Sequence, residues 1–384
     1  MTTTKMFRRS VLPLSLCATS VAFGQSGPVP AAAGQPDTFT PVVLEPKPVL
    51  RNHISMGFQL GFNIRTSFKH IGRFAPATNP GSTNGLSNHF YDDGYNLVDS
   101  TGNEHFAGTD GDGNPIFKQG TWNFGFNNFA NQVHGNGDAD GTIDMHSTSS
   151  SGGTSADRSN DPRPGFVLTF GRELYRDEKD RWRTGLDWSF GYTDYVIKDS
   201  SAVNAKATQL TDTYSLFGDQ LPTQPSYSQG ANGDPNHNII SDTPTRSLSS
   251  AVVPVSGTRK FGADIFAFRL GPYFEIPLNK TFSFSLEGGA ALVYVYSRFQ
   301  FNEEIMAPGG LLNVKGNGVH DGIQLGGYVG GKISAALSEK VSLFAGAQWL
   351  DAGTYVHRNH ATGEAAVLDL SQSVFFTTGI GYSF

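Results

Sequence analysis

A short acidic segment is the part of this sequence that comes closest to a metal site. Its candidate ligands are Asn136, Asp138, Asp140 and Asp144. Their spacing, with Gly141 at the turn, matches the early positions of an EF-hand-like calcium loop. The last position, which needs a bidentate glutamate, is instead Ser147, and no helical pattern flanks the segment. Turn formation by Asp-Gly sequences explains the same residues, so calcium binding is an expectation that calorimetry would test.

Histidine is the residue most often used as a general base, and it acts on a nucleophile or water held against it. The 10 histidines lie at the ends of the alternating apolar stretches described below, or between those stretches; they are His53, His70, His89, His105, His134, His146, His237, His320, His357 and His360. An isolated loop histidine is usually only solvated. We therefore expect no catalytic site, and a His-Asp site built from loop residues is the alternative.

The composition excludes several classes of protein. Of 384 residues, 38% are apolar, 12% aromatic and only 16% charged, with 46 glycines and 29 phenylalanines. These are too few charges for a nucleic-acid binder and too many aromatics for a disordered chain. Apolar runs beyond the N-terminus are far shorter than the ~20 residues of a membrane-spanning helix. A single cysteine excludes a disulfide scaffold, so a glycine- and aromatic-rich all-β protein remains.

The first residues have the pattern of a secretory signal peptide. Basic residues precede an apolar stretch over residues 11–23, and small residues surround Gly24. We therefore expect residues 1–24 to be a cleaved signal peptide. Residues 25–50 contain many prolines without periodicity, which predicts an extended Pro-rich periplasmic segment. Cleavage makes the formal net charge more negative than −6, which disfavours nucleic acid as a partner.

Beyond residue 50 the sequence alternates apolar residues with small or polar ones, and a period of two predicts β-strands with two unlike faces. In one stretch, Phe266, Phe268 and Leu270 alternate with Ala267 and Arg269. The alternating stretches are residues 54–68, 166–174, 181–196, 261–276, 281–301, 321–337, 341–353 and 370–384. Aromatic and aliphatic residues dominate one face of each, and small or polar residues dominate the other.

The connections between these stretches alternate strictly in length. Short polar turns cover residues 175–180, 277–280 and 338–340, and long connections cover 69–165, 197–260, 302–320 and 354–369. This alternation is typical of transmembrane β-barrels, whereas a soluble sandwich or lipocalin-type barrel would mix connection lengths and carry more charge outside. We therefore predict an all-β, eight-stranded antiparallel transmembrane β-barrel over residues 51–384, with short periplasmic turns and long extracellular loops. Two more strands, near residues 91–98 and 121–126, would make ten.

Side chains fill the interior of an eight-stranded barrel, so charges that face it must be paired. The charged residues on the polar faces of the predicted strands balance in sign: Arg65, Arg183, Arg269 and Lys332 against Glu173, Asp187, Glu275 and Glu287. Those at similar heights on consecutive strands are Asp187, Arg269, Glu287 and Lys332. We expect an ion-pair layer there that plugs the lumen, and a gated pore or proton path is the alternative.

The last predicted strand carries a terminal motif. The chain ends in Phe384, and aromatic or apolar residues occupy alternate preceding positions: Tyr382, Ile380 and Phe376. With the signal peptide and the strand count, this ending is similar to that of small outer-membrane β-barrel proteins of the OmpA membrane domain and OmpX kind. The resemblance covers residues 51–384 as architecture and only the last strand as a motif. It implies recognition by the barrel-assembly machinery and a Gram-negative-type outer membrane, and we expect no peptidoglycan-binding domain.

These expectations define the function coarsely. We expect an outer-membrane β-barrel protein with a structural or surface-interaction role, whose long loops, chiefly 69–165 and 197–260, contact an unknown extracellular ligand. The lipid bilayer and, during biogenesis, the assembly machinery are the other expected partners, and no cofactor is expected apart from the calcium hypothesis. The alternatives are a small channel and, because outer-membrane barrels can be enzymes, a lipid A-modifying enzyme or a protease.

Overall fold

The structure is a computed structural model of the 384-residue chain. It describes residues 51–384 except 85–86, 100–103, 231–237 and 309. The expected signal peptide and Pro-rich segment lie outside the described residues. Every described element belongs to one compact unit, Lys47–Phe384.

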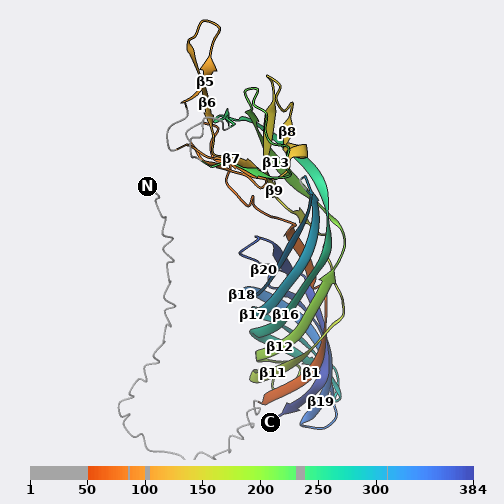
Figure 1. The fold of residues 1–384 in the computed structure, drawn as a ribbon. Coiled ribbons are helices and arrows are strands. Elements are labelled where there is room, and N and C mark those ends of the chain that lie inside the picture. Colours follow the sequence, from red (N-terminus) through yellow and green to blue (C-terminus); the bar gives the residue numbers. More distant parts are fainter. Residues whose placement is uncertain (1–50, 85–86, 100–103, 231–237, 309) are drawn as a thin grey trace, which may run out of the picture. The chain divides into compact units, whose positions relative to one another are not determined.

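Eight antiparallel strands form a closed ring (Figure 1). They are β1 (Asn52–Phe62), β11 (Arg163–Arg176), β12 (Arg183–Asp199), β16 (Thr245–Pro277), β17 (Phe282–Ala307), β18 (Gly310–Ala336), β19 (Val341–Asp351) and β22 (Ser373–Ser383). Neighbours pair in the order β12-β11-β1-β22-β19-β18-β17-β16, and pairing of β16 with β12 closes the ring. The predicted eight-stranded barrel is therefore confirmed. The ten-stranded alternative is wrong, because β4 (Gly94–Asn96) and β7 (Phe124–Phe126) pair in a separate sheet.

Short turns connect β11 to β12, β16 to β17 and β18 to β19, and we call this end of the barrel the turn end. The first turn is held by Asp177, whose carboxylate accepts hydrogen bonds from the backbone N–H groups of Lys179 and Arg181. The other end, where the long connections leave the ring, is the loop end.

Large apolar side chains cover the outer face of the ring. We call this surface the apolar belt; its exposed residues include Met56, Phe58, Phe166, Leu168, Phe170, Leu186, Trp188, Phe268, Leu270, Phe274, Leu286, Leu292, Leu325, Val329, Ile333, Leu343, Trp349, Phe376 and Ile380. Soluble monomers rarely expose contiguous apolar patches above a few hundred Å². A closed ring with an apolar outer surface is the architecture of a transmembrane β-barrel.

The interior of the ring has two zones. Toward the turn end lies the polar zone: Ser55, Glu173, Asp187, Ser189, Arg269, Tyr273, Ser285, Glu287, Lys332 and Gln348. Toward the loop end lies the apolar plug, which belongs to one buried core and contains Ile64, Phe68, Ile71, Tyr195, Phe261, Ile265, Val293, Val295, Phe299, Tyr355 and Leu368. The expected ionic plug therefore does not extend through the lumen, because its loop-end part is filled by apolar side chains.

The first predicted strand breaks within its alternating stretch. The backbone turns at Asn63, which has φ 60°, a left-handed conformation that asparagine tolerates better than most residues. The following β2 (Arg65–Ile71) leaves the ring and joins a four-stranded sheet with β10 (Gly153–Thr154), β21 (Ala365–Asp369) and β20 (Thr354–Arg358), in the order β10-β2-β21-β20. This sheet contributes fully buried side chains to the plug, including Phe68, whose ring stacks on Phe299 at 5.6 Å.

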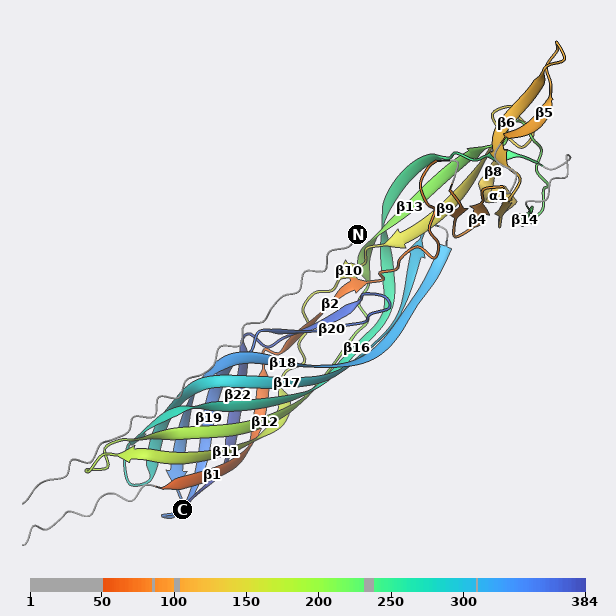
Figure 2. The same cartoon turned by 90° about the vertical axis from the view of Figure 1, so that its left-hand side faces the viewer.

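Three ring strands continue past the belt at the loop end (Figure 2). We call this continuation the extension: residues 245–264 of β16, 297–307 of β17 and 310–322 of β18. Most of residues 302–320, which we expected to form a long connection, belong to the end of β17 and the start of β18, and these strands pair as far as Ala307 and Gly310. On the other side of β16, the sheet continues through β13 (Val203–Ser215), β9 (Thr142–Ser150) and β8 (Val133–His134).

The expected loops at 69–165 and 197–260 contain further small sheets. One joins β14 (Tyr227–Ser228), β7, β4 and β3 (His89–Phe90), and another joins β15 (Ile240–Ser241), β6 (Pro115–Thr121) and β5 (Glu104–Thr109). A second buried core, the distal core, includes Tyr91, Phe124, Phe126, Ile143, Met145 and Tyr214. A short helix, α1 (Phe129–Gln132), lies between β7 and β8. In the part of the chain that the structure describes, no helix has the length and apolarity to cross a membrane.

Candidate functional site

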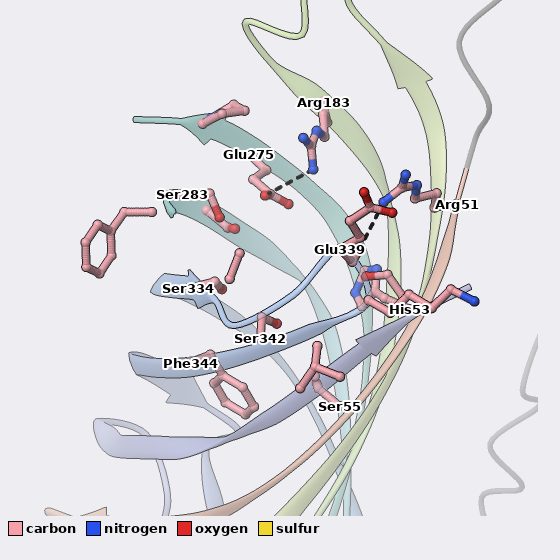
Figure 3. A pocket seen from close by; sticks show the side chains of 18 of the residues that line it. Arg51, His53, Ser55, Arg183, Glu275, Ser283, Ser334, Glu339, Ser342 and Phe344 are labelled. Carbon is pink, nitrogen blue, oxygen red and sulfur yellow. Dashed lines mark hydrogen bonds and ion pairs between the residues drawn. The ribbon is translucent and has the colours of Figure 1, made fainter. Parts of the chain in front are cut away.

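A polar cavity of about 190 Å³ opens at the turn end of the barrel. Its charged lining residues are Arg51, His53, Glu173, Arg176, Arg183, Glu275, Lys280, Lys332, Glu339 and Lys340, and serines from five ring strands surround them. Figure 3 shows Arg183 and Glu275 facing each other, 3.7 Å apart, and Arg51 donating to the backbone of Glu339 at 3.2 Å. Arg176 pairs with Glu173 at 2.6 Å. Four of the charged residues that line this mouth therefore pair with one another.

Deeper in the polar zone lie the residues expected to form the ion-pair layer. Asp187 and Arg269 are almost fully buried. Among the described residues, no ion pair within 4.0 Å joins any two of Asp187, Arg269, Glu287 and Lys332. Their short contacts go elsewhere: Asp187 Oδ1 lies 3.2 Å from His53 Nε2, and Glu287 accepts a hydrogen bond from Gln348 at 3.0 Å. Lys332 Nζ lies 5.8 Å from the ring of Phe344.

Glycines make the room that these charged side chains occupy. A Cβ on Gly171 would lie 2.2 Å from Asp187 Oδ1, and one on Gly191 would lie 2.7 Å from Arg269 Nη2. Both approaches are too close for a real methyl group, so the small inward residues of β11 and β12 are a steric requirement of the polar zone. Arg65 does not join the set, because β2 has left the ring and Arg65 is exposed.

An arginine and two glutamates are buried inside the extension, beyond the apolar belt. Arg259 bonds to Glu303 at 3.0 Å and to Asp199 at 3.2 Å. The N–H of Gly72 donates to Glu303 at 2.7 Å and to Glu364 at 2.9 Å, which holds the two carboxyl groups together. Burial, and then the neighbouring Glu303, raise the pKa of Glu364 to about 10. At neutral pH the Glu364 carboxyl therefore keeps its proton.

A second buried network in the extension contains a serine and a histidine. Ser297 Oγ lies 2.7 Å from His357 Nδ1 and 2.7 Å from the hydroxyl of Tyr355, which in turn lies 2.8 Å from His320 Nδ1. Burial lowers the pKa of His357 to about 4, so its imidazole is neutral. A Ser–His pair could in principle act as nucleophile and base. Ser297 and His357 are 0% and 1% exposed, however, so the pair fixes β20 against the extension and does not meet a substrate.

The distal core is joined to the extension by a buried ion pair. Asp212 is fully buried and accepts two hydrogen bonds from Arg246, at 2.7 and 2.8 Å, and one from the hydroxyl of Tyr91 at 2.5 Å. Burial raises the pKa of Tyr91, so the phenol remains a donor. This network joins β13 and β16 to the segment before β4, and it ties the small sheets to the extension.

A larger cavity, about 520 Å³, lies where the tips of β17 and β18 meet the segments around β4 and β9. Its lining mixes apolar residues, such as Phe74 and Leu312, with Asp92, Asp93 and His146. His146 Nδ1 lies 2.7 Å from Asp93, and this hydrogen bond raises the pKa of His146. The cavity is outside the apolar belt and open to solutes, so it is a candidate contact site.

Two residues of the expected calcium loop have other partners. Asn136 both donates to and accepts from the backbone of Leu221, and Asp144 accepts from Thr213 at 2.6 Å. Within the described residues, no group of three or more His, Cys, Asp or Glu side chains has the arrangement of a metal site. The terminal motif residues Phe376, Ile380, Tyr382 and Phe384 all lie exposed on the outer face of the last strand and the residue after it.

The sequence reasoning missed the apolar plug and the buried networks of the extension. A signal for the plug is present: on β17 the apolar residues change from even positions, such as Leu292, to odd positions, such as Phe299 and Phe301. Since successive residues of a strand face opposite sides, this change moves the apolar face from outside to inside.

Comparisons with known proteins found no matching family model and no matching curated protein. Three solved structures align over most of the chain. They are the attachment invasion locus protein Ail of Yersinia pestis (TM-score 0.27, 10% identity, 87% of this chain and 99% of that chain), the outer membrane protease OmpT of Escherichia coli (0.28, 10%, 87% and 96%) and the transport unit of the autotransporter AIDA-I of Escherichia coli (0.19, 11%, 91% and 94%). Because these TM-scores are low, the assignment of this chain as an eight-stranded β-barrel rests on its own strand pairings.

Proposed function

We propose that this chain is an outer-membrane protein whose plugged barrel anchors a β-structured contact surface outside the cell. In this proposal the barrel belongs with the small barrels of the OmpA membrane domain and OmpX kind, it inserts with the help of the barrel-assembly machinery, and residues 1–24 are removed during export. The observation that carries the proposal is the combination of a closed interior with strands that continue past the apolar belt.

The closed interior favours an anchor over a channel. The plug draws side chains from three ring strands and from the β2, β20 and β21 sheet, and its members include Phe68, Phe299 and Leu368, all at most 1% exposed. An eight-stranded barrel has an interior just wide enough for side chains. Filling by these described side chains disfavours a continuous water path for ions.

The extension and the small sheets favour a contact role. Strands β16, β17 and β18 carry hydrogen-bonded sheet beyond the belt, and the ion pair of Asp212 and Arg246 fixes the distal core to it. Binding residues commonly lie on loops held by a rigid scaffold. The cavity of about 520 Å³ lined by Asp93 and His146 is the candidate site for an extracellular ligand.

Planar-bilayer recording of the purified protein tests the anchor. Wild type is expected to give no steady conductance. Phe68→Ala removes a fully buried ring, at a cost of about 3–5 kcal/mol, and is expected to give intermittent openings because it loosens the plug. The matched control is Phe58→Ala, which removes a ring from the belt and leaves the interior unchanged.

Two results would replace the proposal. Steady ohmic current through the wild-type protein would favour a small channel. Hydrolysis of lipid A or of a peptide by the purified protein, lost in His357→Ala or His146→Ala, would favour an enzyme. Limited proteolysis with and without calcium tests the acidic segment around Asp140, since a bound ion would raise the resistance of that segment to cleavage.

A further inference from the structure

Two lysines face each other on the outer surface of the barrel, beyond the apolar belt. In the antiparallel register of β12 and β16, Lys198 stands directly opposite Lys260. Both side chains are exposed and point outward, because Ile197, Asp199 and Phe261 beside them are buried. Like charges directly opposite one another destabilise a sheet. Neither lysine has an acidic side chain within ion-pair distance among the described residues.

A hollow of about 400 Å³ adjoins Lys198. Its lining residues are Arg158, Ser159, Asn160, Arg163, Val196, Ile197 and Lys198. The guanidinium of Arg163 is almost fully buried; Nη2 donates to the backbone of Val196, and Nε has no acceptor. The side chain of Arg158 is 47% exposed. Every charged side chain that lines the hollow is therefore cationic, and a serine and an asparagine supply further donors.

The acids of β12 and β16 nearest the two lysines do not neutralise them. Asp199 points inward, where it pairs with Arg259 at 3.2 Å and only loosely with Arg158 at 3.7 Å. Asp194 and Asp264 stand opposite each other nearer the belt, and Asp264 pairs with Arg298 at 3.7 Å. Lys198 and Lys260 remain without a counter-ion, which is an arrangement suited to a bound anion.

The position of the lysines limits which anions can reach them. Tyr192 marks the loop-end edge of the belt, and Lys198 lies six residues further along β12, about 20 Å at ~3.3 Å per residue. With a strand tilt of roughly 40°, the lysines lie about 15 Å above that edge, and lysine side chains are long enough to extend back toward the membrane. A phospholipid headgroup extends only about 5–7 Å from the hydrocarbon, so a larger headgroup is required.

We propose that Lys198, Lys260, Arg158 and Arg163 bind the phosphate groups of a glycolipid headgroup in the leaflet at the loop end. The proposal rests on the proposed function, because it requires that the ring spans the membrane in the way described. Arginine provides paired donors to phosphate oxygens and lysine provides point charges. The bound lipid relieves the repulsion between the two lysines, and it orients the extension with respect to the membrane.

Lipid retention by the reconstituted full chain tests this site. The protein is placed in phosphatidylcholine nanodiscs that contain a few per cent of a diphosphorylated glucosamine-disaccharide lipid, and the lipid that copurifies after mild detergent extraction is quantified by mass spectrometry. Wild type is expected to enrich the phosphorylated lipid, and each lysine is expected to raise this enrichment about fivefold. Lys198→Ser with Lys260→Ser is expected to abolish the enrichment. Lys280→Ser with Lys315→Ser, two exposed lysines elsewhere, is the matched control and should retain it.

Further measurements have outcomes that would overturn the lipid proposal. Equal retention of the same lipid after phosphatase treatment, or an unchanged double variant, overturns the proposal. Titration of inorganic phosphate into detergent-solubilised protein identifies the source: binding as tight as that of the lipid would make this a site for a soluble anion and overturn the lipid assignment. Insertion is measured separately by heat-modifiable gel migration. A wild-type protein that fails to insert defeats the proposed function itself, whereas an inserted barrel without enrichment defeats only this inference.

Discussion

Replacing Glu364 by glutamine should make the loop end of the barrel insensitive to pH. Glu364 and Glu303 are 1% and 0% exposed, and both accept a hydrogen bond from Gly72. Arg259 bonds to Glu303 and Asp199, so its charge is already shared. Burial, and then Glu303, raise the pKa of Glu364 to about 10, far above its ordinary value of 4.5.

The direction in which pH changes the stability of the closed form follows from the pKa of Glu364 in the closed and in the open form. When β2 and β21 separate, Glu364 becomes solvated and its pKa returns to the ordinary value. Between about pH 4.5 and pH 10 the closed form therefore holds one proton more than the open form. The stabilisation is fully present below the lower value, and it is lost progressively as pH rises toward the upper one. The loss is at most about 1.4 kcal/mol per pH unit, so raising pH from 6 to 8 should cost the closed form up to about 2.7 kcal/mol.

Glu364→Gln imitates the protonated acid at every pH. Its amide oxygen can still accept from Gly72, and its amide N–H can donate to Glu303. Hydrogen exchange of the backbone of β2 and β21, measured by mass spectrometry at pH 6 and pH 8 and corrected for intrinsic exchange rates, reports the opening free energy. Wild type should lose protection between the two pH values, and Glu364→Gln should not.

Glu304→Gln is the matched control, because Glu304 is exposed on the same strand as Glu303. It should keep the wild-type pH dependence. A pH dependence in Glu364→Gln equal to that of wild type would refute the reasoning, since the titrating group would then lie elsewhere.

Three further outcomes are expected. Asp212→Ala leaves Arg246 without its buried partner and should destabilise the distal core by about 2–4 kcal/mol; limited proteolysis should then cleave the small sheets, while heat-modifiable migration of the barrel is unchanged. Gly171→Ala places a Cβ 2.2 Å from Asp187 Oδ1 and should lower the temperature at which heat modification occurs, at a cost of roughly 1–3 kcal/mol. Fluorescence of Trp188, which is 56% exposed in the apolar belt, should be quenched by brominated acyl chains, and quenching equal to that by a water-soluble quencher would contradict the membrane position of the belt.

The ring was predictable from sequence because the bilayer imposes one rule on every strand that crosses it. Outward residues must be apolar and inward residues must be small or polar, and that rule appears as an unbroken period of two. Four outward residues are exposed as a membrane barrel requires and a soluble core forbids: Phe58 (49%), Leu186 (43%), Leu286 (50%) and Ile380 (45%). Short turns between such strands then fix the pairing order.

The break at Asn63 was not predictable from the same period. Ile64 and Phe68 continue the even positions of β1, so the sequence gives no interruption in alternation at the point where the chain leaves the ring. Only the left-handed backbone of Asn63 separates the two strands. Period-two patterns report which face is apolar and carry no information about a change of sheet.

The side-chain contacts within the polar zone could not be predicted from the sequence either. Heights measured from the turns placed Asp187 and Arg269 near each other, and both are indeed buried inside the ring. Which carboxylate meets which cation depends on side-chain reach across the lumen, and here His53 reaches Asp187 from β1. His53 lies at the start of β1, where the alternation of the sequence does not show which face of the strand its side chain occupies.

The extension shows which change in the sequence pattern marks the boundary of the membrane. On β12, Trp188 and the other even positions face the lipid, whereas Tyr195 and Ile197, at odd positions, are buried inside; β16 and β17 change in the same way. The change occurs at one register level, because Tyr192 pairs with Phe266 and Phe266 pairs with Tyr294. Water solvates the outer face above this level, so the apolar side chains must turn inward there. A coincident phase reversal on three neighbouring strands therefore marks where the bilayer ends, and beyond that level the same strands obey the rules of a soluble protein core.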